Sequence, residues 1–398
     1  MLNKYKTFTK DKTTGVELNP VFKIEYDNYK LKEVVSNAVE TLEIKDNRTK
    51  AMVTFVGVTF ITLASKVPMT RIANLESDIL KSNVLDGMQM FTGANYQVPS
   101  IFSLGVAPVV SAGILLNLLK KVFPKLEDSL NEVYNQHQVR VIKRGLTFLI
   151  GLGQSLVLSN ITNGGVLVAV VMALGGVLMG VITDYMTDHG LINGNSAVIG
   201  ASIINNILGG GIKSIILSPL MVSSFLRLHS SHIRIPTRNR KGRKGYIPFK
   251  IFSAGTLPII LASSIVSIVA FFAPSLMLQF SWIVAMIQAM MIYLLNHFEN
   301  KVNYDTVGIT KELRRKSIGI VNSKSKLRTK DVLDETVSTV SSVSGIMLVI
   351  MGILPMVFGA SSFINVSSLF VLSGIVYELI VKFKSESVVK NRHGFLSK

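Results

Sequence analysis

The stretch GLTFLIGLGQSLVLSNITNGGVLVAVVMALGGVLMGVIT, residues 145–183, contains no Asp, Glu, Lys or Arg over 39 residues. A membrane-spanning helix needs about 20 predominantly apolar residues, so this stretch is long enough for two. The turn signal Asn163-Gly164-Gly165 divides it into spans of roughly 145–160 and 164–183. The residues show no sustained alternation, and the runs exceed the ~9–11 residues of a barrel strand. The stretch therefore predicts a helical hairpin in a membrane.

Six further stretches lack charged side chains, and their lengths predict the rest of the bundle. Two of them, 251–298 and 336–377, are long enough for two spans each, and the other four fit one each. A charge at the bilayer centre costs roughly 2.5–3.5 kcal/mol on insertion scales, which explains why the charges lie at span ends. We therefore expect an all-α polytopic membrane protein with ten transmembrane helices. The spans are roughly 51–69, 99–119, 145–160, 164–183, 195–208, 212–228, 251–272, 279–297, 336–357 and 364–381.

The distribution of basic residues predicts the orientation of this bundle. The 398 residues carry 42 Lys plus Arg against 24 Asp plus Glu, a net charge of +18, with a mean hydropathy of +0.44. With the N-terminus inside, 38 of the 42 basic residues lie on the cytoplasmic side, so both termini are expected in the cytoplasm. The apolar content excludes a disordered basic protein. The absence of Cys excludes disulfides and cysteine-based metal or redox sites.

An internal repeat relates two of the expected spans. Residues 101–112 and 251–262 share Ile, Phe, Ser, Gly, Pro and Ala in one register, at an offset of 150 residues and five spans. Because five is odd, the two copies cross the membrane in opposite directions, which is typical of an inverted repeat of two five-helix halves. Such repeats place a pathway between the halves, and the shared Gly-x-x-Pro suits a helix that lines it.

The sequence shows little of the chemistry that enzymes or ion-coupled transporters need. There is no Walker A pattern, no expected cofactor and no set of nucleophile, base and acid, so we expect no enzyme. His229 and His232 have metal-like spacing without a third ligand nearby. Asp184 and Asp188 share one helix face, which favours a helix-end pair over a proton or cation site. A secondary transporter with inverted repeats is the alternative function, but it would normally carry a mid-span charge, and none is present.

Two cytoplasmic loops carry more basic residues than orientation requires. The loop 233–250 reads IRIPTRNRKGRKGYIPFK and holds no acid, and the loop 298–335 adds a second cluster that includes Arg314-Arg315-Lys316. Two interpretations remain open: topology with contact to anionic lipid, or docking of an acidic partner or ribosomal RNA. Upstream, segment 21–46 predicts either an amphipathic helix on the membrane or a solvated tail.

Several segments resemble the SecY family, the pore subunit of the protein-translocation channel. The matches occur in the family's order over most of residues 50–385 and include the entries to the spans at 99–119 and 251–272. The matching runs are VPMT (67–70), SIFSLGVAPVVSAGILLNLL (100–119), KRGLTFLIGLGQS (143–155), MTDHGLINGNSAVI (186–199) and IPFKIFSAGTLPIILASSI (247–265).

The resemblance implies a channel that moves polypeptides across, or laterally into, the bacterial cytoplasmic membrane. It implies a plug at about 75–95 and a lateral gate with Asn117 and Gln154 at polar positions. An apolar ring would exclude ions by dewetting without holding a passing chain. The ring positions implied are Val106, Val110, Ile199, Ile260 and Val371. The residues implied for docking of a motor or a ribosome are Arg238, Arg240, Lys241, Arg243, Lys244 and Lys324.

The resemblance also implies partners and a division of the chain. The expected partners are SecE-like and SecG-like small subunits, a SecA-type ATPase or a ribosome, and a secretory polypeptide, besides anionic lipid. The expected parts are a cytoplasmic segment 1–50, an N-terminal half 51–208, a C-terminal half 209–385 and a tail 386–398. The sequence departs from the family at Asn195, where an apolar ring residue is usual, and in the loop near Lys324, which lacks the family's Pro-Gly-x-Arg-Pro-Gly. These departures favour a divergent or accessory SecY with a dedicated motor.

Overall fold

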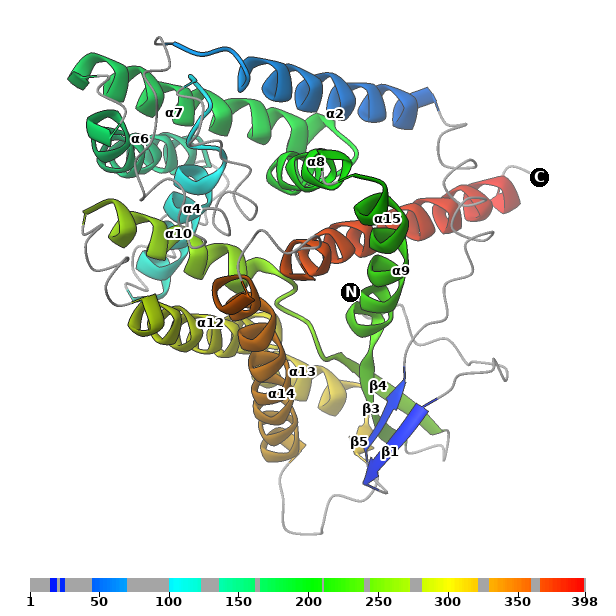
Figure 1. The fold of residues 1–398 in the computed structure, drawn as a ribbon. Coiled ribbons are helices and arrows are strands. Elements are labelled where there is room, and N and C mark those ends of the chain that lie inside the picture. The colour runs from blue at the N-terminus through cyan, green and yellow to red at the C-terminus, as the bar shows by residue number, and fades with distance from the viewer. Residues whose placement is uncertain are drawn as a thin grey trace.

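The computed structural model describes residues 15–19, 22–25, 45–69, 100–122, 136–161, 165–209, 211–239, 244–272, 281–320, 329–358 and 366–396. Within these residues, one long helix coincides with each expected span (Figure 1). They are α2 (Lys45–Ala64), α4 (Ala107–Val122), α6 (Gln136–Ile161), α7 (Gly165–His189), α8 (Gly194–Gly209), α9 (Gly211–Ser230), α10 (Leu257–Phe272), α12 (Ser281–Asn303), α14 (Thr329–Phe358) and α15 (Val366–Leu396). The plug expected at 75–95 lies outside the described residues.

The helices differ in how fully they could cross a bilayer by themselves. Among the described residues, three helical segments are long and apolar enough to do so: Gly165–His189, Thr329–Ile353 and Val366–Ser385. By contrast, α4, α8 and α10 have 16 residues each. At 1.5 Å per residue such a helix is about 24 Å long, which is less than the ~30 Å hydrocarbon core. Their ends therefore depend on neighbouring segments for cover.

Two of the short helices begin later than the charge pattern suggested. The spans expected from 99 and 251 start as turns over residues 101–106 and 251–256, and the helices begin at Ala107 and Leu257. In each turn a glycine with positive φ donates its amide to a phenylalanine carbonyl three residues earlier. The repeat read from the sequence is thus a repeated turn followed by a helix.

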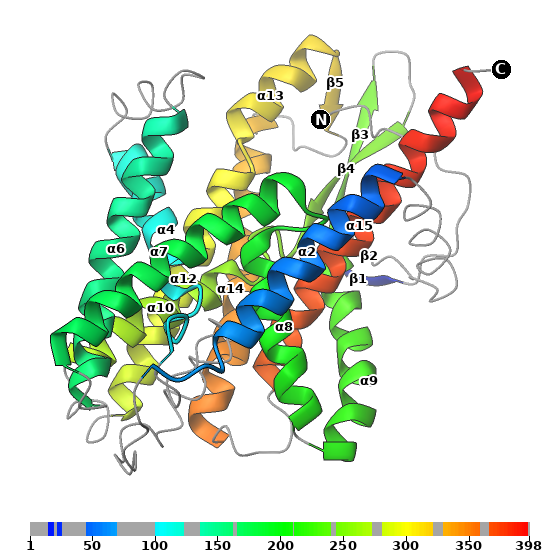
Figure 2. The same ribbon diagram turned by 90° about the horizontal axis from the view of Figure 1, so that it is seen from above.

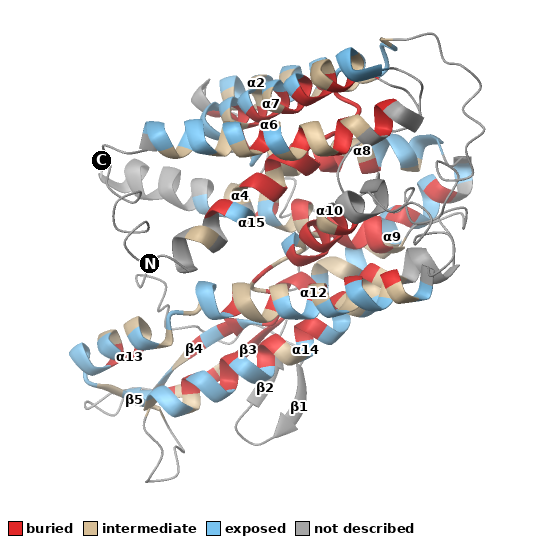
Figure 3. Cartoon of the chain, turned by 90° about the vertical axis from the view of Figure 1, so that its left-hand side faces the viewer, coloured by how far each residue is buried: buried red, intermediate tan, exposed pale blue. Residues whose placement is uncertain are grey.

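The helices pack as two groups with α4 and α10 between them (Figure 1). In the N-terminal group α7 packs against α6, α2 and α8, and in the C-terminal group α12 packs against α14 while α15 packs against α9. Contacts between the groups run from α4 and α6 to α10, and from α8 to α15. Buried residues are prominent on α4 and α10, which contact each other (Figure 3). The expected arrangement of two five-helix halves around a central seam is therefore present.

A ladder of small and amide side chains joins α12 to α14. Asn296 donates from Nδ2 to the Ser341 carbonyl (2.7 Å) and to Ser344 Oγ (3.0 Å). Gly345 lies so close that a Cβ there would be 2.8 Å from the Tyr293 ring. The buried Asn296 amide is satisfied by partners on α14, and the two helices pack closely along this ladder.

A five-stranded sheet lies beside this bundle, below α9 in Figure 1, and it was not predicted. Its strands are β1 (Gly15–Asn19), β2 (Phe22–Glu25), β3 (His232–Asn239), β4 (Lys244–Lys250) and β5 (Ile318–Ile320). The order is β1-β2-β3-β4. β5 pairs with residues 237–239 of β3, whereas β2 pairs with residues 232–234 of the same strand. The first basic loop is therefore a β-hairpin. The helix or tail expected over 21–46 is wrong at residues 22–25, which form a strand; residues 26–44 lie outside the described part.

The sheet has a small hydrophobic core of its own. Alternate residues of β3 and β4 pack against the helix α13 (Thr306–Arg315) and the start of α14, as the period of a half-buried strand requires. The buried side chains are Ile235, Ile247, Phe249, Leu313, Leu333 and Val337. The second basic loop thus contributes α13 and β5 to the same unit as the first (Figure 2).

Candidate functional site: the seam between the two halves

The five residues expected to form an apolar ring belong to or pack against the main hydrophobic core, a cluster whose 23 buried residues in the described part also include Ile61 of α2 and Leu348 of α14. Val106, Ile199 and Val371 are 0%, 2% and 0% exposed, and Ile260 is 8% exposed. Val110 is partly buried and packs against this cluster. The residues come from the turn before α4 and from α4, α8, α10 and α15, so both halves contribute. Apolar side chains from both sides therefore meet at the seam.

Val110 and Ile260 occupy equivalent places in the two copies of the repeat. Each lies near the start of its helix, where the amide of Val110 bonds the Val106 carbonyl (3.0 Å) and that of Ile260 bonds the Thr256 carbonyl (3.4 Å). The repeated turn thus presents one branched apolar residue from each half to the same cluster. This pairing follows from the offset of 150 residues.

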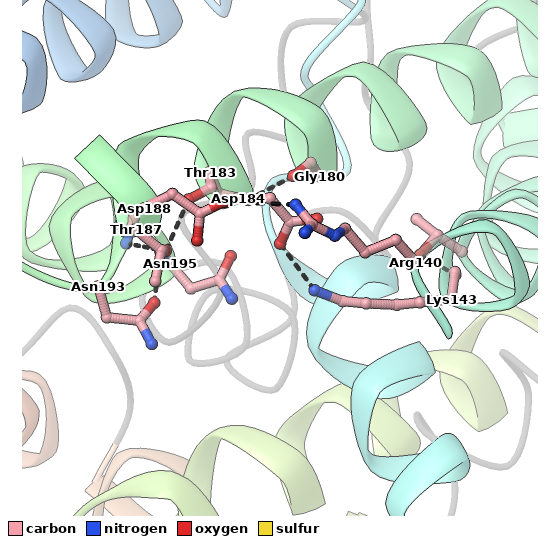
Figure 4. A network of polar contacts seen from close by, with 11 residues as sticks. Arg140, Lys143, Gly180, Thr183, Asp184, Thr187, Asp188, Asn193 and Asn195 are labelled. Carbon is pink, nitrogen blue, oxygen red and sulfur yellow. Dashed lines mark hydrogen bonds and ion pairs between the residues drawn. The ribbon is translucent and has the colours of Figure 1, made fainter. Parts of the chain in front are cut away.

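Asn195 brings a polar group to the edge of this apolar region. It lies one helical turn before Ile199 in α8, and its amide donates to Asn193 Oδ1 (3.0 Å; Figure 4). Its own Oδ1 is buried and accepts no hydrogen bond from the described residues. A buried acceptor without a partner costs about 1–3 kcal/mol, which makes this position unusual for a residue of a closed seal.

Polar residues are also buried on α6, α10 and α12, where α10 contacts both of the other helices. Gln154 of α6 is 1% exposed. Gln288 of α12 donates to Ser263 Oγ of α10 (3.3 Å), and both of these side chains are buried. The hydrogen bond between Gln288 and Ser263 was not predicted, although Gln288 is a polar residue in a charge-free stretch. Asn117 is on α4, but its side chain lies outside the described part, and with it the expected pairing of the two gate residues.

Two ion pairs connect α6 to α7 at one end of the bundle (Figure 4). Lys143 Nζ lies 2.9 Å from Asp184 Oδ1, with both side chains about one quarter exposed. Arg140 lies 3.4 Å from Asp188, and both of these are about half exposed. The two carboxylates are therefore explained by basic partners one helix away, which favours the helix-end interpretation over a cation site.

Next to these ion pairs, α7 turns tightly into α8. The Gly194 amide donates to Thr187 Oγ1 (2.9 Å), and a Cβ at Gly194 would overlap the Thr183 carbonyl. The Leu191 amide donates to Thr54 Oγ1 of α2 (2.9 Å). This turn fixes the direction in which α8 leaves, and hence the places of Asn195 and Ile199.

His229 lies inside an aromatic cluster, and His232 lies in the sheet. The His229 ring is 3% exposed, 4.6 Å from the Phe370 ring and 5.7 Å from the Phe252 ring, and its Nε2 is 3.3 Å from the Phe370 carbonyl. His232 Nε2 accepts from Arg234 Nε (3.1 Å). Both rings are thus held by protein groups, and no group of three or more metal-ligating His, Asp or Glu occurs in the described residues. His229 joins α9 to α15 beside Val371, a role that sequence reasoning did not anticipate.

The structure places only part of the expected docking residues. Arg238 is exposed on β3, and Lys244 begins β4. Arg240, Lys241, Arg243 and Lys324 lie outside the described residues. Exposed basic residues of the adjoining α13 end, Lys311, Arg314 and Arg315, stand on the same unit, because β5 and α13 pack against β3 and β4. The two basic loops thus form one folded surface.

Tyr304, which directly follows α12, contacts the end of β4. Its hydroxyl donates to the Lys250 carbonyl (3.0 Å), and its ring lies 4.9 Å from the Phe249 ring. Burial raises the pKa of the Tyr304 phenol, so the neutral, donating form is favoured. The end of β4 is thereby held against the bundle.

Comparisons with known proteins agree with this architecture. The SecY family model matches residues 100–380. Protein translocase subunit SecY of Thermotoga maritima is 22% identical, over 92% of this chain and 98% of that protein. Protein translocase subunit SecY 2 of Lactobacillus kefiranofaciens is 24% identical, over 78% of this chain and 90% of that one. The solved structure of Sec61 in the canine ribosome-channel complex from the endoplasmic reticulum is similar in fold, with a TM-score of 0.62, 14% identity, and coverage of 86% and 93%.

Proposed function

The chain belongs to the SecY family and is the channel-forming subunit of a preprotein translocase, and we propose that its apolar cluster closes the polypeptide path. The predicted fold and family are confirmed by these matches, and a secondary transporter is not favoured. One observation supports the proposal: the five ring positions, from turns and helices of both halves, all belong to or pack against the main hydrophobic core.

The proposed seal works by excluding water. Val106, Val110, Ile199, Ile260 and Val371 offer no hydrogen bonds, so a narrow ring of them dewets and blocks ions. The same side chains bind a passing polypeptide weakly. No step in this mechanism makes or breaks a covalent bond, and we therefore expect the protein to perform no catalysis. The plug proposed at about 75–95 would add a second barrier.

We place the lateral gate where α4 and α6 face α10 and α12. In the described structure α10 contacts both α4 and α6, and this arrangement is the proposed closed state of the gate. The ion pairs tie α6 to α7, and the amide ladder ties α12 to α14. Opening should therefore separate two intact helical hairpins, with Gln154 and Asn117 on the parting surfaces.

The basic surface formed by β3, β4 and α13 is the proposed dock for the energy source. Loops 227–250 and 298–335 carry 17 of the basic residues, and they share one sheet and one core. That shared fold supports placing both loops on the same side of the membrane, which we propose is the cytoplasmic side. Both termini are proposed to lie on this side as well, in a bacterial cytoplasmic membrane. A ribosome or a SecA-type ATPase would supply acidic or phosphate groups. Anionic lipid headgroups would add further contacts.

Further partners and the division of the chain are proposed by family. We expect SecE-like and SecG-like small subunits, with the former holding the halves 51–208 and 209–385 together, flanked by the segment 1–50 and the tail 386–398. The similarity to a SecY 2 protein supports an accessory Sec system. Lys324 and the unusual loop around it favour a dedicated motor.

A cross-linking experiment tests the path. The chain has no Cys, so single cysteines at Val106, Val110 or Ile260 are the sole thiols. Each should form a disulfide with a cysteine in a stalled secretory polypeptide. Leu167, which is 80% exposed on α7, serves as the control position expected to face lipid. Equal cross-linking from Leu167→Cys and the ring variants, or none from the ring, would refute the assignment.

A further inference from the structure

The hairpin of β3 and β4 leaves the bundle at a point where α9, α15 and the turn before α10 meet. β3 begins two residues after α9 ends, and β4 ends directly before that turn. The Ile251 amide donates to the Ser231 carbonyl (3.0 Å), which joins the two ends of the hairpin. Lys250, the last residue of β4, places Nζ 4.7 Å from the centre of the Tyr377 ring of α15. His229 lies two residues before Ser231, at the root of the hairpin.

Aromatic rings from α15 and from the turn before α10 surround the His229 ring. The centre of the His229 ring lies 4.6 Å from that of Phe370, 5.7 Å from that of Phe252 and 6.3 Å from that of Tyr377. Phe252 and Phe370 also meet edge to face, at 5.7 Å. Phe225, one helical turn before His229 in α9, meets the Phe370 ring in the same manner at 5.5 Å. This aromatic cluster therefore ties three elements together around one histidine.

His229 adds a directional contact to this packing. Its Nε2 lies 3.3 Å from the Phe370 carbonyl. A carbonyl oxygen only accepts hydrogen bonds, so Nε2 carries the hydrogen and donates it. Ser373 Oγ donates to the same carbonyl (2.6 Å), but Ser373 is itself a residue of α15. Of these two donors, His229 is therefore the one that holds α15 to another element.

Gly374 gives the His229 ring its place against α15. A Cβ at Gly374 would lie 3.3 Å from His229 Cε1 and 2.9 Å from Thr256 Cγ2. Favourable contacts between carbon atoms are about 3.5–4.0 Å, so any side chain at this position would push both neighbours away. The missing side chain thus lets α9 and the turn before α10 approach the same turn of α15.

Two of the proposed ring residues adjoin this contact. Val371 directly follows Phe370, and the Ile260 amide bonds the Thr256 carbonyl (3.4 Å). Val371 and Ile260 both belong to the main hydrophobic core. The contact of His229 with α15 therefore helps to set how closely Val371 and Ile260 approach each other. Because an apolar constriction excludes ions by dewetting, a small increase in its width lets ions pass.

We propose that His229 is a positioning residue of the seal, and that its hydrogen bond to the Phe370 carbonyl holds Val371 in place against the turn that leads to Ile260. This role rests on the proposed function of the five ring residues as a seal. His229 acts through α15, and its position at the root of the hairpin places it between the sheet and the seam.

Ion conductance of the resting full-length channel in planar bilayers tests this role. His229→Phe keeps an aromatic ring and removes the donor, so the conductance should rise by at least about threefold. His229→Gln, whose Nε2 can donate to the same carbonyl, should restore most of the unaltered value. Gly374→Ala leaves His229 unchanged but pushes its ring away from α15, so it should raise the conductance as His229→Phe does.

Two further variants separate this role from its alternatives. Ser373→Ala is the matched control, because it removes a donor to the same carbonyl from within α15, and it should leave the conductance unchanged. Val371→Ala tests the seal by itself and should raise the conductance. A rise in Val371→Ala without a rise in His229→Phe or Gly374→Ala would overturn the role of His229 and leave the seal intact, whereas no rise in any variant would overturn both. Equal rises in His229→Phe and His229→Gln, or a lower midpoint of thermal unfolding at unchanged conductance, would also overturn the proposal.

Discussion

Gly105 and Gly255 adopt the same left-handed conformation, with φ of +59° and +63°, and each donates its amide to a phenylalanine carbonyl three residues earlier. The two residues are 150 positions apart and lie in turns that lead into α4 and α10. The phenylalanines, Phe102 and Phe252, are both buried in the cluster at the seam. A backbone conformation that side chains disfavour is therefore repeated at the same place in the two halves.

We predict that Gly105→Ala and Gly255→Ala each destabilise the protein by about 1 kcal/mol, because a Cβ disfavours positive φ. The midpoint of thermal unfolding in detergent micelles should fall in both variants. Gly145→Ala is the matched control, since Gly145 is exposed in α6 with open space around its Cβ position and no positive φ. That variant should be neutral or more stable by up to about 1 kcal/mol. An equal fall in all three would contradict the role of φ.

The helices were predictable because the bilayer imposes one strong rule on the sequence. A charge-free stretch of adequate length predicts a span, and every expected span contains a helix. The rule does not show where a stretch begins as a turn, as at residues 101–106 and 251–256. There the requirement is a local backbone hydrogen bond at a glycine, which hydropathy does not register.

The sheet was missed because basic residues and prolines obscured its local hairpin, and because its other strands pair with distant parts of the sequence. Ile233, Ile235 and Thr237 do alternate with polar residues and prolines, which is the period of a half-buried strand. The basic residues and prolines of this loop obscured that signal. The strand β2 pairs more than 200 residues away, and only tertiary structure reveals such a pairing. His229 is similar, since its partner Phe370 lies 141 residues further along.

Asn195→Ile should reduce ion leak through the resting channel. The buried Oδ1 of Asn195 lacks a hydrogen-bond partner in the described structure and would hold water near the apolar cluster. Conductance of the purified channel in planar bilayers is the measurement. Asn206→Ile, an exposed position in the same helix, is the control and should leave the conductance unchanged. Equal conductance of Asn195→Ile and the unaltered channel would place Asn195 away from the constriction.

The two ion pairs between α6 and α7 should differ in their contribution to stability. Lys143–Asp184 is shorter and less exposed than Arg140–Asp188. We expect Asp184→Asn to cost about 1 kcal/mol and Asp188→Asn less than about 0.5 kcal/mol, because solvent screens exposed pairs. The reversed pair Lys143→Asp/Asp184→Lys should recover part of the loss, as a double-mutant cycle of thermal unfolding would show. If neither asparagine variant changes stability, the pairs do not hold α6 to α7.

Reversing the basic turn between β3 and β4 should weaken docking without affecting the fold. In the variant with Glu at positions 240, 241, 243 and 244, four positive charges become negative, and none of these residues belongs to the core of the sheet. Binding of ribosomes or of a SecA-type ATPase to the reconstituted channel should fall by at least about tenfold, and raising the salt concentration should weaken the unaltered channel in the same direction. The control is a variant with Glu at positions 384, 390, 392 and 398, which makes the same change of charge near the C-terminus. Equal loss from both variants would assign the effect to net charge, and no loss from either would return these residues to a role in membrane orientation.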